Sequence, residues 1–234
     1  MTPPRILTPP RILIATAVPA ERDAVARAVS AAPPEHRSAY DCVAVGVGPA
    51  AAAAGTATAL TTAALRGEPY HLVVSAGIGG GFQPEAPVGS LVIADALVAA
   101  DLGAETGEGF LSVTDLGFGT SEHTPPPARA RDAAAVTGAR TGTVLTVSTV
   151  TGTARRAAEL RERHPEAVAE AMEGFGVAEA AAAHGVPVLE VRAVSNPVGP
   201  RDRAAWRIGD ALAALTAAFG ALVPVLVLPL EESP

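Results

Sequence analysis

The chain has 234 residues, which suits one α/β domain with a sizeable core better than two small domains. Its 17 basic residues are all arginine and face 24 acidic residues, so the net charge of −7 argues against a general binder of nucleic acid or anionic membrane. The lack of lysine excludes a lysine-bearing phosphate loop, a lysine Schiff base and a lysine general base.

Short runs of β-branched and apolar residues alternate along the chain with alanine-rich stretches of helical spacing. We expect strands at 11–17, 42–47, 70–76, 89–98, 143–149 and 187–195. We expect helices at 19–31, 49–65, 153–163, 174–185 and 204–220. This alternation predicts an α/β fold, a single-domain three-layer sandwich whose mixed, largely parallel central sheet carries helices on both faces.

The two ends of the chain bear on its domain organisation and location. The start repeats Thr-Pro-Pro-Arg-Ile-Leu in tandem, and only the second copy runs into a strand, so we expect an extension over 1–10 and a domain over 11–230. The first apolar stretch is too short and too rich in Thr and Pro for a secretion signal. Pro224 and Pro229 interrupt the uncharged C-terminal stretch, which favours a buried helix and a short extended tail over a membrane span. With a single cysteine, Cys42, no internal disulfide can form, and we expect a cytoplasmic protein.

The stretch 101–127 differs from the rest of the chain in character. It carries five glycines, five acidic residues and three consecutive prolines. We expect a long surface excursion over one edge of the sheet, which is either a specificity loop or simply mobile.

Two glycine clusters follow predicted strands. The segment 46–51, Gly-Val-Gly-Pro-Ala-Ala, fits the dinucleotide pattern G-x-G-x-x-[G/A], with Glu68 about twenty residues on. The motif stands in the second βα unit and Glu68 lies in a turn, so a dinucleotide-binding module is a weaker alternative from another class. The second cluster, 73–82, is expected at a strand carboxyl end, where it either lets backbone amides approach a ligand or marks only a tight turn.

Three polar residues, Glu21, Glu173 and Asn196, are predicted at strand carboxyl ends or at the helix starts beside them. Each has an ordinary structural explanation, since both glutamates suit the first turn of a helix and Asn196 suits a turn before Pro197. Placed together at one edge of one sheet, they indicate a site.

Several motifs carry a resemblance to a known family over about Arg11 to Val223. They are the Glu21 helix start, Gly46-Val-Gly48, Ser75-Ala-Gly77, Val88-Gly-Ser90, Met172-Glu173 and Arg192-Ala-Val-Ser-Asn196. On these residues the chain resembles the nucleoside phosphorylase/nucleosidase superfamily, and the segment 197–210 is similar to the futalosine hydrolase family within it.

The resemblance implies cleavage of the N-ribosidic bond of futalosine with release of hypoxanthine, a step of menaquinone biosynthesis. Such cleavage builds positive charge on the ribose and negative charge on the purine. By this resemblance Glu173 would accept hydrogen bonds from the ribose hydroxyls, Met172 would pack beneath the sugar, and Glu21 would deprotonate the attacking water. A carboxylate repels a phosphate dianion, which favours hydrolysis, but Arg22 keeps a purine nucleoside phosphorylase open as an alternative.

Asn196 departs from the pattern of adenine-releasing nucleosidases, which carry Asp at this position. An amide cannot protonate the purine, but its NH₂ group can donate to N7 or O6 of a 6-oxopurine. Hypoxanthine is therefore the expected base, and a methylthioadenosine/S-adenosylhomocysteine nucleosidase is a weaker alternative.

The remaining substrate contacts follow only from the resemblance. They are Gly48, Ser75, Ala76 and Gly77 in the glycine clusters, Val150 and Thr151 beside the purine, and Trp206 near the 5′ substituent. A carboxylate on the 5′ side would suit an arginine, and the candidates are Arg201, Arg203 and Arg207. The alternatives are that the apolar residues belong to the core, that these arginines pair with nearby aspartates, and that Glu190 and Arg192 pair with each other.

The five histidines show no metal-ligand spacing, and no serine or cysteine stands in a nucleophile-elbow context. We therefore expect no cofactor and no metal. The expected partner is a small nucleoside substrate rather than nucleic acid or membrane, and the resemblance implies a homo-oligomer of open stoichiometry.

Overall fold

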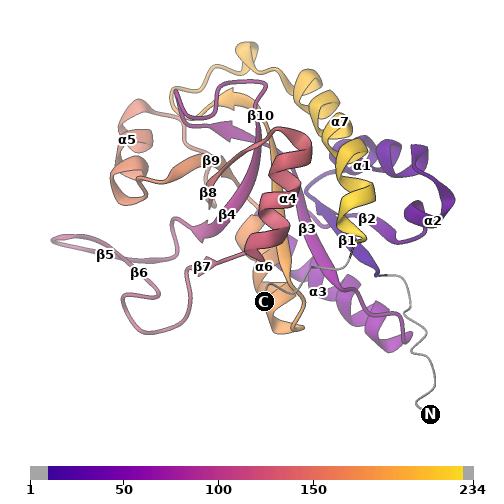
Figure 1. Cartoon of the computed structure of the whole chain (residues 1–234). Helices are drawn as coiled ribbons and strands as arrows, with labels where there is room; N and C mark the ends of the chain where they lie inside the picture. The colour runs from indigo at the N-terminus through magenta and orange to yellow at the C-terminus, as the bar shows by residue number, and fades with distance from the viewer. Residues whose placement is uncertain (1–9, 229–234) are drawn as a thin grey trace.

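A computed structural model describes residues 10–228 and shows one twisted sheet between two helical layers (Figure 1). Within these residues the main sheet contains β1 (Ile12–Thr16), β2 (Tyr40–Ala44), β3 (Leu72–Gly81), β4 (Leu91–Ala99), β7 (Glu122–His123), β8 (Arg140–Thr146), β9 (Ala167–Ala171) and β10 (Val188–Pro197). A separate hairpin contains β5 (Gly103–Thr106) and β6 (Gly109–Ser112). The helices are α1 (Pro19–Ala31), α2 (Pro34–Arg37), α3 (Pro49–Leu65), α4 (Pro127–Thr137), α5 (Ala154–Arg163), α6 (Gly174–Ala183) and α7 (Ile208–Leu226), with a 3-10 turn η1 (Arg203–Ala205).

The sheet is mixed and mostly parallel, as predicted. Strand order runs β10-β4-β8-β9-β3-β1-β2, with β7 paired to β4. Strand β10 also pairs with β3, so β3, β10, β4, β8 and β9 close into a ring. This closure brings the ends of strands distant in sequence to one place.

Helices cover both faces because alternate strand residues point to opposite sides. In β1, Ile12 and Ile14 enter a core shared with α1, α4 and α7, whereas Leu13 and Ala15 enter a second core shared with α3 and α6. The predicted three-layer arrangement is confirmed.

Most predicted elements are present, and the differences have local causes. The helices at 19–31 and 49–65 have the predicted bounds, since each starts at a proline in the first turn. The second strand is 40–44 rather than 42–47, and the predicted end of the third strand at 76 is wrong. Strand β3 continues to Gly81 because β10 and β9 both pair with its glycines. Strand β9 and helix α4 were not predicted.

The stretch 101–127 forms the β5–β6 hairpin, which projects from the body of the fold, and then returns to pair β7 with β4, a strand that lies between β10 and β8 (Figure 1). The predicted last helix starts at Ile208 rather than at 204 and runs through Pro224 to Leu226. It is long and apolar enough to cross a membrane, with mean hydropathy 1.7, yet Leu215, Phe219 and Leu222 are fully buried in the core. The expectation that an extended tail follows residue 220 is wrong as far as Leu226, because the chain is still helical there. The first repeat copy and the residues from Pro229 lie outside the described residues.

Candidate active site

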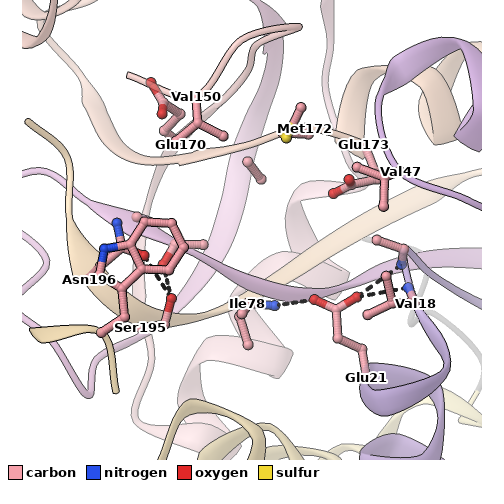
Figure 2. A pocket seen from close by; sticks show the side chains of 15 residues that line it. Val18, Glu21, Val47, Ile78, Val150, Glu170, Met172, Glu173, Ser195 and Asn196 are labelled. Atoms are coloured by element: carbon pink, nitrogen blue, oxygen red, sulfur yellow. Dashed lines mark hydrogen bonds between the residues drawn. The ribbon is translucent and has the colours of Figure 1, made fainter. Parts of the chain in front are cut away.

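A cavity of about 220 Å³ opens where β1, β2, β8, β9 and β10 end. Strand carboxyl ends are the usual ligand site of α/β sheets. The structure brings Glu21, Glu173 and Asn196 together in its wall. The other lining residues are Ala17, Val18, Val47, Ile78, Gly79, Gly80, Val150, Glu170, Ala171, Met172, Ser195 and Trp206. Figure 2 shows Glu21 and Glu173 on one side of the cavity and Asn196 on the other.

Glu21 lies at the third residue of α1 with its side chain only 4% exposed. One carboxylate oxygen, Oε2, accepts hydrogen bonds from the backbone N–H groups of Ala17 at 3.0 Å and Val18 at 3.3 Å. The other, Oε1, accepts from the N–H of Ile78 at 2.9 Å. Burial raises the pKa of Glu21, while the charge of Arg192 and the N–H bonds oppose that rise. The result is a fixed carboxylate suited to accept a proton.

Glu173 stands just before α6 and is held from two sides. Its Oε1 accepts a hydrogen bond from the N–H of Gly48 at 3.2 Å, and its Oε2 faces Nη1 of Arg192 at 3.3 Å. Gly48 has a φ of +87°, a conformation that favours glycine. The first glycine loop therefore binds the site's own carboxylate rather than presenting a free cradle for phosphates.

Arg192 holds the polar side chains of the site in place, a role that the sequence did not predict. It is 1% exposed and donates through Nε to Glu190 at 2.8 Å and through Nη2 to Ser75 Oγ at 3.0 Å. The expected pairing of Glu190 with Arg192 is confirmed, and the same guanidinium also reaches Glu173. Burial raises the pKa of Glu190, and the adjacent guanidinium opposes that rise.

The predicted contacts Ser75, Ala76 and Gly77 lie behind the cavity wall rather than in it. Ser75 and Ala76 are buried, and the next residues of β3, from Ile78 to Gly80, form the wall. Gly77 leaves room for the charged groups, because a Cβ there would lie 2.6 Å from Glu21 Oε1.

Asn196, at the end of β10, has a fixed amide. Its Oδ1 accepts a hydrogen bond from Ser195 Oγ at 2.8 Å, and its Nδ2 donates to the carbonyl of Pro197 at 3.0 Å. One N–H of the amide therefore remains to face a ligand.

Two of the other predicted contacts, Val150 and Trp206, line the cavity, whereas Thr151 is buried behind it. Thr151 donates to Glu170 from its backbone N–H at 2.9 Å and from its hydroxyl. Glu170 lines the cavity and is not among the residues predicted from the sequence. The sequence feature that could have identified Glu170 is its place as an acid inside the apolar run Ala-Val-Ala-Glu-Ala, which forms the unpredicted strand β9.

The structure does not bring Arg203 into the site, because it is exposed on η1. Arg207 pairs with Asp210, as the alternative explanation requires. Arg201 lies over the ring of Trp206, 5.8 Å from its centroid. Over residues 10–228, no group of three or more His, Cys, Asp or Glu is placed to hold a metal ion.

The cavity thus has carboxylates at one end and an amide between apolar walls at the other, at the strand ends of a mixed α/β sheet. This arrangement defines the nucleoside phosphorylase/nucleosidase class. The family model described as "Phosphorylase superfamily" matches residues 36–224. A futalosine hydrolase from Streptomyces coelicolor is 73% identical over 225 residues, covering 92% of this chain and 96% of the relative. One from Acidothermus cellulolyticus is 47% identical, covering 90% and 89%.

Solved structures agree on the fold. A methylthioadenosine/S-adenosylhomocysteine nucleosidase from Neisseria meningitidis, in complex with methylthio-immucillin-A, superposes with a TM-score of 0.77 at 17% identity over 91% of this chain and 98% of that one. The futalosine hydrolase of Helicobacter pylori gives a TM-score of 0.73 at 16% identity over 92% and 98%. The chain belongs to the phosphorylase superfamily and, within it, to the futalosine hydrolase family.

Proposed function

We propose that this protein is a cofactor-free N-glycosyl hydrolase that cleaves futalosine to hypoxanthine and dehypoxanthine futalosine. The observation that supports this proposal most directly is the arrangement of polar groups in the cavity. The buried carboxylates of Glu21 and Glu173 lie at one end, and the amide of Asn196 lies at the other. The names of the relatives at 73% and 47% identity support this substrate.

The carboxylate end suits the ribose. Bond cleavage leaves positive charge on the sugar, which an anion stabilises, and Glu173 can accept hydrogen bonds from the ribose hydroxyls. Glu21 orients a water molecule toward the anomeric carbon and takes its proton. The water oxygen bonds to that carbon while the bond to the purine nitrogen breaks, and the released purine takes up a proton. Met172 supplies an apolar surface beneath the sugar.

Water is favoured over phosphate as the nucleophile. Of the described residues that line the cavity, none is an arginine or a lysine, and a phosphate dianion would lie beside carboxylates. Arg22, the residue that kept phosphorolysis open, pairs with Asp23 at 2.8 Å and does not line the cavity. The hydrolase is therefore the better interpretation.

The dinucleotide alternative fits the contacts poorly. The Gly48 N–H that would face a pyrophosphate donates to Glu173, and Glu68 pairs with Arg11 at 3.1 Å rather than reaching a ribose at this site.

The amide end suits a 6-oxopurine. Asn196 can donate to N7 or O6, and Val150 supplies an apolar wall for the ring. Trp206 would flank the 5′ substituent, and Arg201, stacked over it, is the best placed of the three arginines to meet a carboxylate there.

The proposal extends to the setting of the enzyme. It would be a cytoplasmic homo-oligomer with one catalytic domain over 11–230, acting on a small nucleoside in menaquinone biosynthesis. The net charge of −7 supports a partner that is neither nucleic acid nor an anionic membrane.

The test incubates the purified protein with futalosine, inosine and methylthioadenosine, with and without phosphate, and identifies the released base and sugar. We expect hypoxanthine from futalosine at a rate that does not depend on phosphate. Preferential release of adenine, or a sugar phosphate formed only with phosphate, would overturn the proposal. An exposed-site control, Glu35→Gln, should match the wild type.

A further inference from the structure

The mechanism leaves one buried carboxylate of the cavity unused. Glu170, near the end of β9, is 4% exposed and lines the cavity. Figure 2 shows it near Val150 and on the side of Asn196, away from Glu21 and Glu173. It therefore belongs to the end of the cavity where the purine would lie.

Sheet register relates Glu170 directly to Asn196. Gly80 of β3 pairs with Glu170 of β9 on one side and with Asn196 of β10 on the other. Residues in register across adjacent strands project to the same face, so the carboxylate and the amide flank a residue without a side chain. Their backbones are two strand spacings apart, roughly 10 Å. The arrangement leaves a slot with a carboxylate on one edge and an amide on the other.

Gly80 is part of this slot. A Cβ at this position would lie 3.3 Å from Asn196 Nδ2 and 2.9 Å from a methyl of Val198. A side chain here would crowd the amide and fill the floor, so the glycine keeps space for a flat ring.

The carboxylate of Glu170 is fixed and still has acceptor capacity. Thr151 donates one hydrogen bond to each oxygen, from its N–H and from its hydroxyl. A carboxylate can accept about four hydrogen bonds, so lone pairs remain for a ligand. Burial raises the pKa of Glu170, and both Thr151 bonds lower it.

We propose that Glu170 is a specificity-determining residue that accepts the N1–H of a 6-oxopurine while Asn196 donates to N7 or O6 of the same base. This inference rests on the proposed function. A 6-oxopurine has a hydrogen on N1, whereas adenine presents a lone pair there. A carboxylate facing that lone pair would be left unpaired, so 6-aminopurines are rejected.

The contact acts in binding more than in the chemical step. As negative charge grows on the leaving purine, N1–H becomes a weaker donor, so the bond is not strengthened in the transition state. Loss of the carboxylate should therefore raise KM more than it lowers kcat.

The test measures inhibition constants for hypoxanthine, 1-methylhypoxanthine and adenine, which report on the purine slot directly. Glu170→Ala should weaken hypoxanthine about 10- to 100-fold, the usual loss for a hydrogen bond to a charged group, and leave 1-methylhypoxanthine nearly unchanged. Glu170→Gln can donate to the adenine N1 and should raise the ratio of adenine to hypoxanthine affinity by about tenfold or more. Glu159→Gln, on the outer helix α5, is the matched control and should leave both ratios unchanged.

A purely structural role for Glu170 would weaken all three bases alike, and that result would overturn the inference. The inference would also be overturned if wild-type protein bound hypoxanthine and 1-methylhypoxanthine equally, or if it bound no purine base. Failure of the proposed function would give a different result: wild-type protein would bind hypoxanthine selectively but would not hydrolyse futalosine.

Discussion

Gly77→Ala should disable the site through a single methyl group. Gly77 lies in β3, pairs in register with Arg192, and has an ordinary backbone conformation that alanine can adopt. A Cβ at this position would lie 2.6 Å from Glu21 Oε1 and 2.7 Å from Arg192 Nη1. Glu21 would have to retreat by roughly 0.8 Å to reach ordinary contact at 3.4 Å. That movement breaks its 2.9 Å bond from the Ile78 N–H.

The expected loss follows from this displacement. Misplacing a catalytic group by about 1 Å can cost 10²-fold, so we expect kcat/KM for futalosine to fall about 100-fold. This corresponds to about 2.7 kcal/mol, within the range of one hydrogen bond to a charged group. Steady-state kinetics measure the loss, and urea unfolding measures the accompanying change in stability.

Gly220→Ala is the matched control, because a Cβ at this position in α7 meets nothing within 4 Å. It should keep full activity and gain up to about 1 kcal/mol of stability from helix propensity. A Gly77→Ala enzyme within about threefold of wild-type kcat/KM would refute the reasoning, since Glu21 would then tolerate displacement.

Four further outcomes follow from the same contacts. Because burial raises the pKa of Glu21 and the base must be ionised, activity should be lost as pH falls through a midpoint above 4.5; a midpoint at or below 4.5 in the kcat/KM profile would contradict this. Glu21→Gln should lower kcat by orders of magnitude with the fold retained, as judged by circular dichroism. Glu173→Gln should do the same, and near-normal turnover would remove its assigned role. Gly174→Ala would place a Cβ 2.3 Å from both carboxylate oxygens of the fully buried Glu190, so it should destabilise the protein by about 3 kcal/mol or more in urea unfolding.

Local sequence features determined much of the fold. Alternating apolar runs predicted the layers, and prolines at helix starts placed α1 and α3 to the residue. The acids and the asparagine at predicted strand ends indicated where a site would form. These inferences succeed because periodicity and helix starts depend on neighbours within a few residues.

Only the tertiary structure decided how the site is held. Gly48 donates to Glu173 across 125 residues, and Arg192 donates to Ser75 across 117. Such pairings depend on strand register and on closure of the β3, β10, β4, β8 and β9 ring, which no short window of sequence encodes. The role of Glu170 was hidden for the same reason.

The sequence by itself excluded lysine chemistry and indicated a site at the strand ends, and the resemblance carried by its motifs supplied the class of chemistry. The tertiary structure decided which groups meet: a buried arginine that orients one carboxylate, backbone N–H groups that hold the other, and a glycine that separates Glu170 from Asn196. The physical reason is that residue type and spacing are local properties, whereas the partners of a buried charge are set by which strands the fold brings side by side.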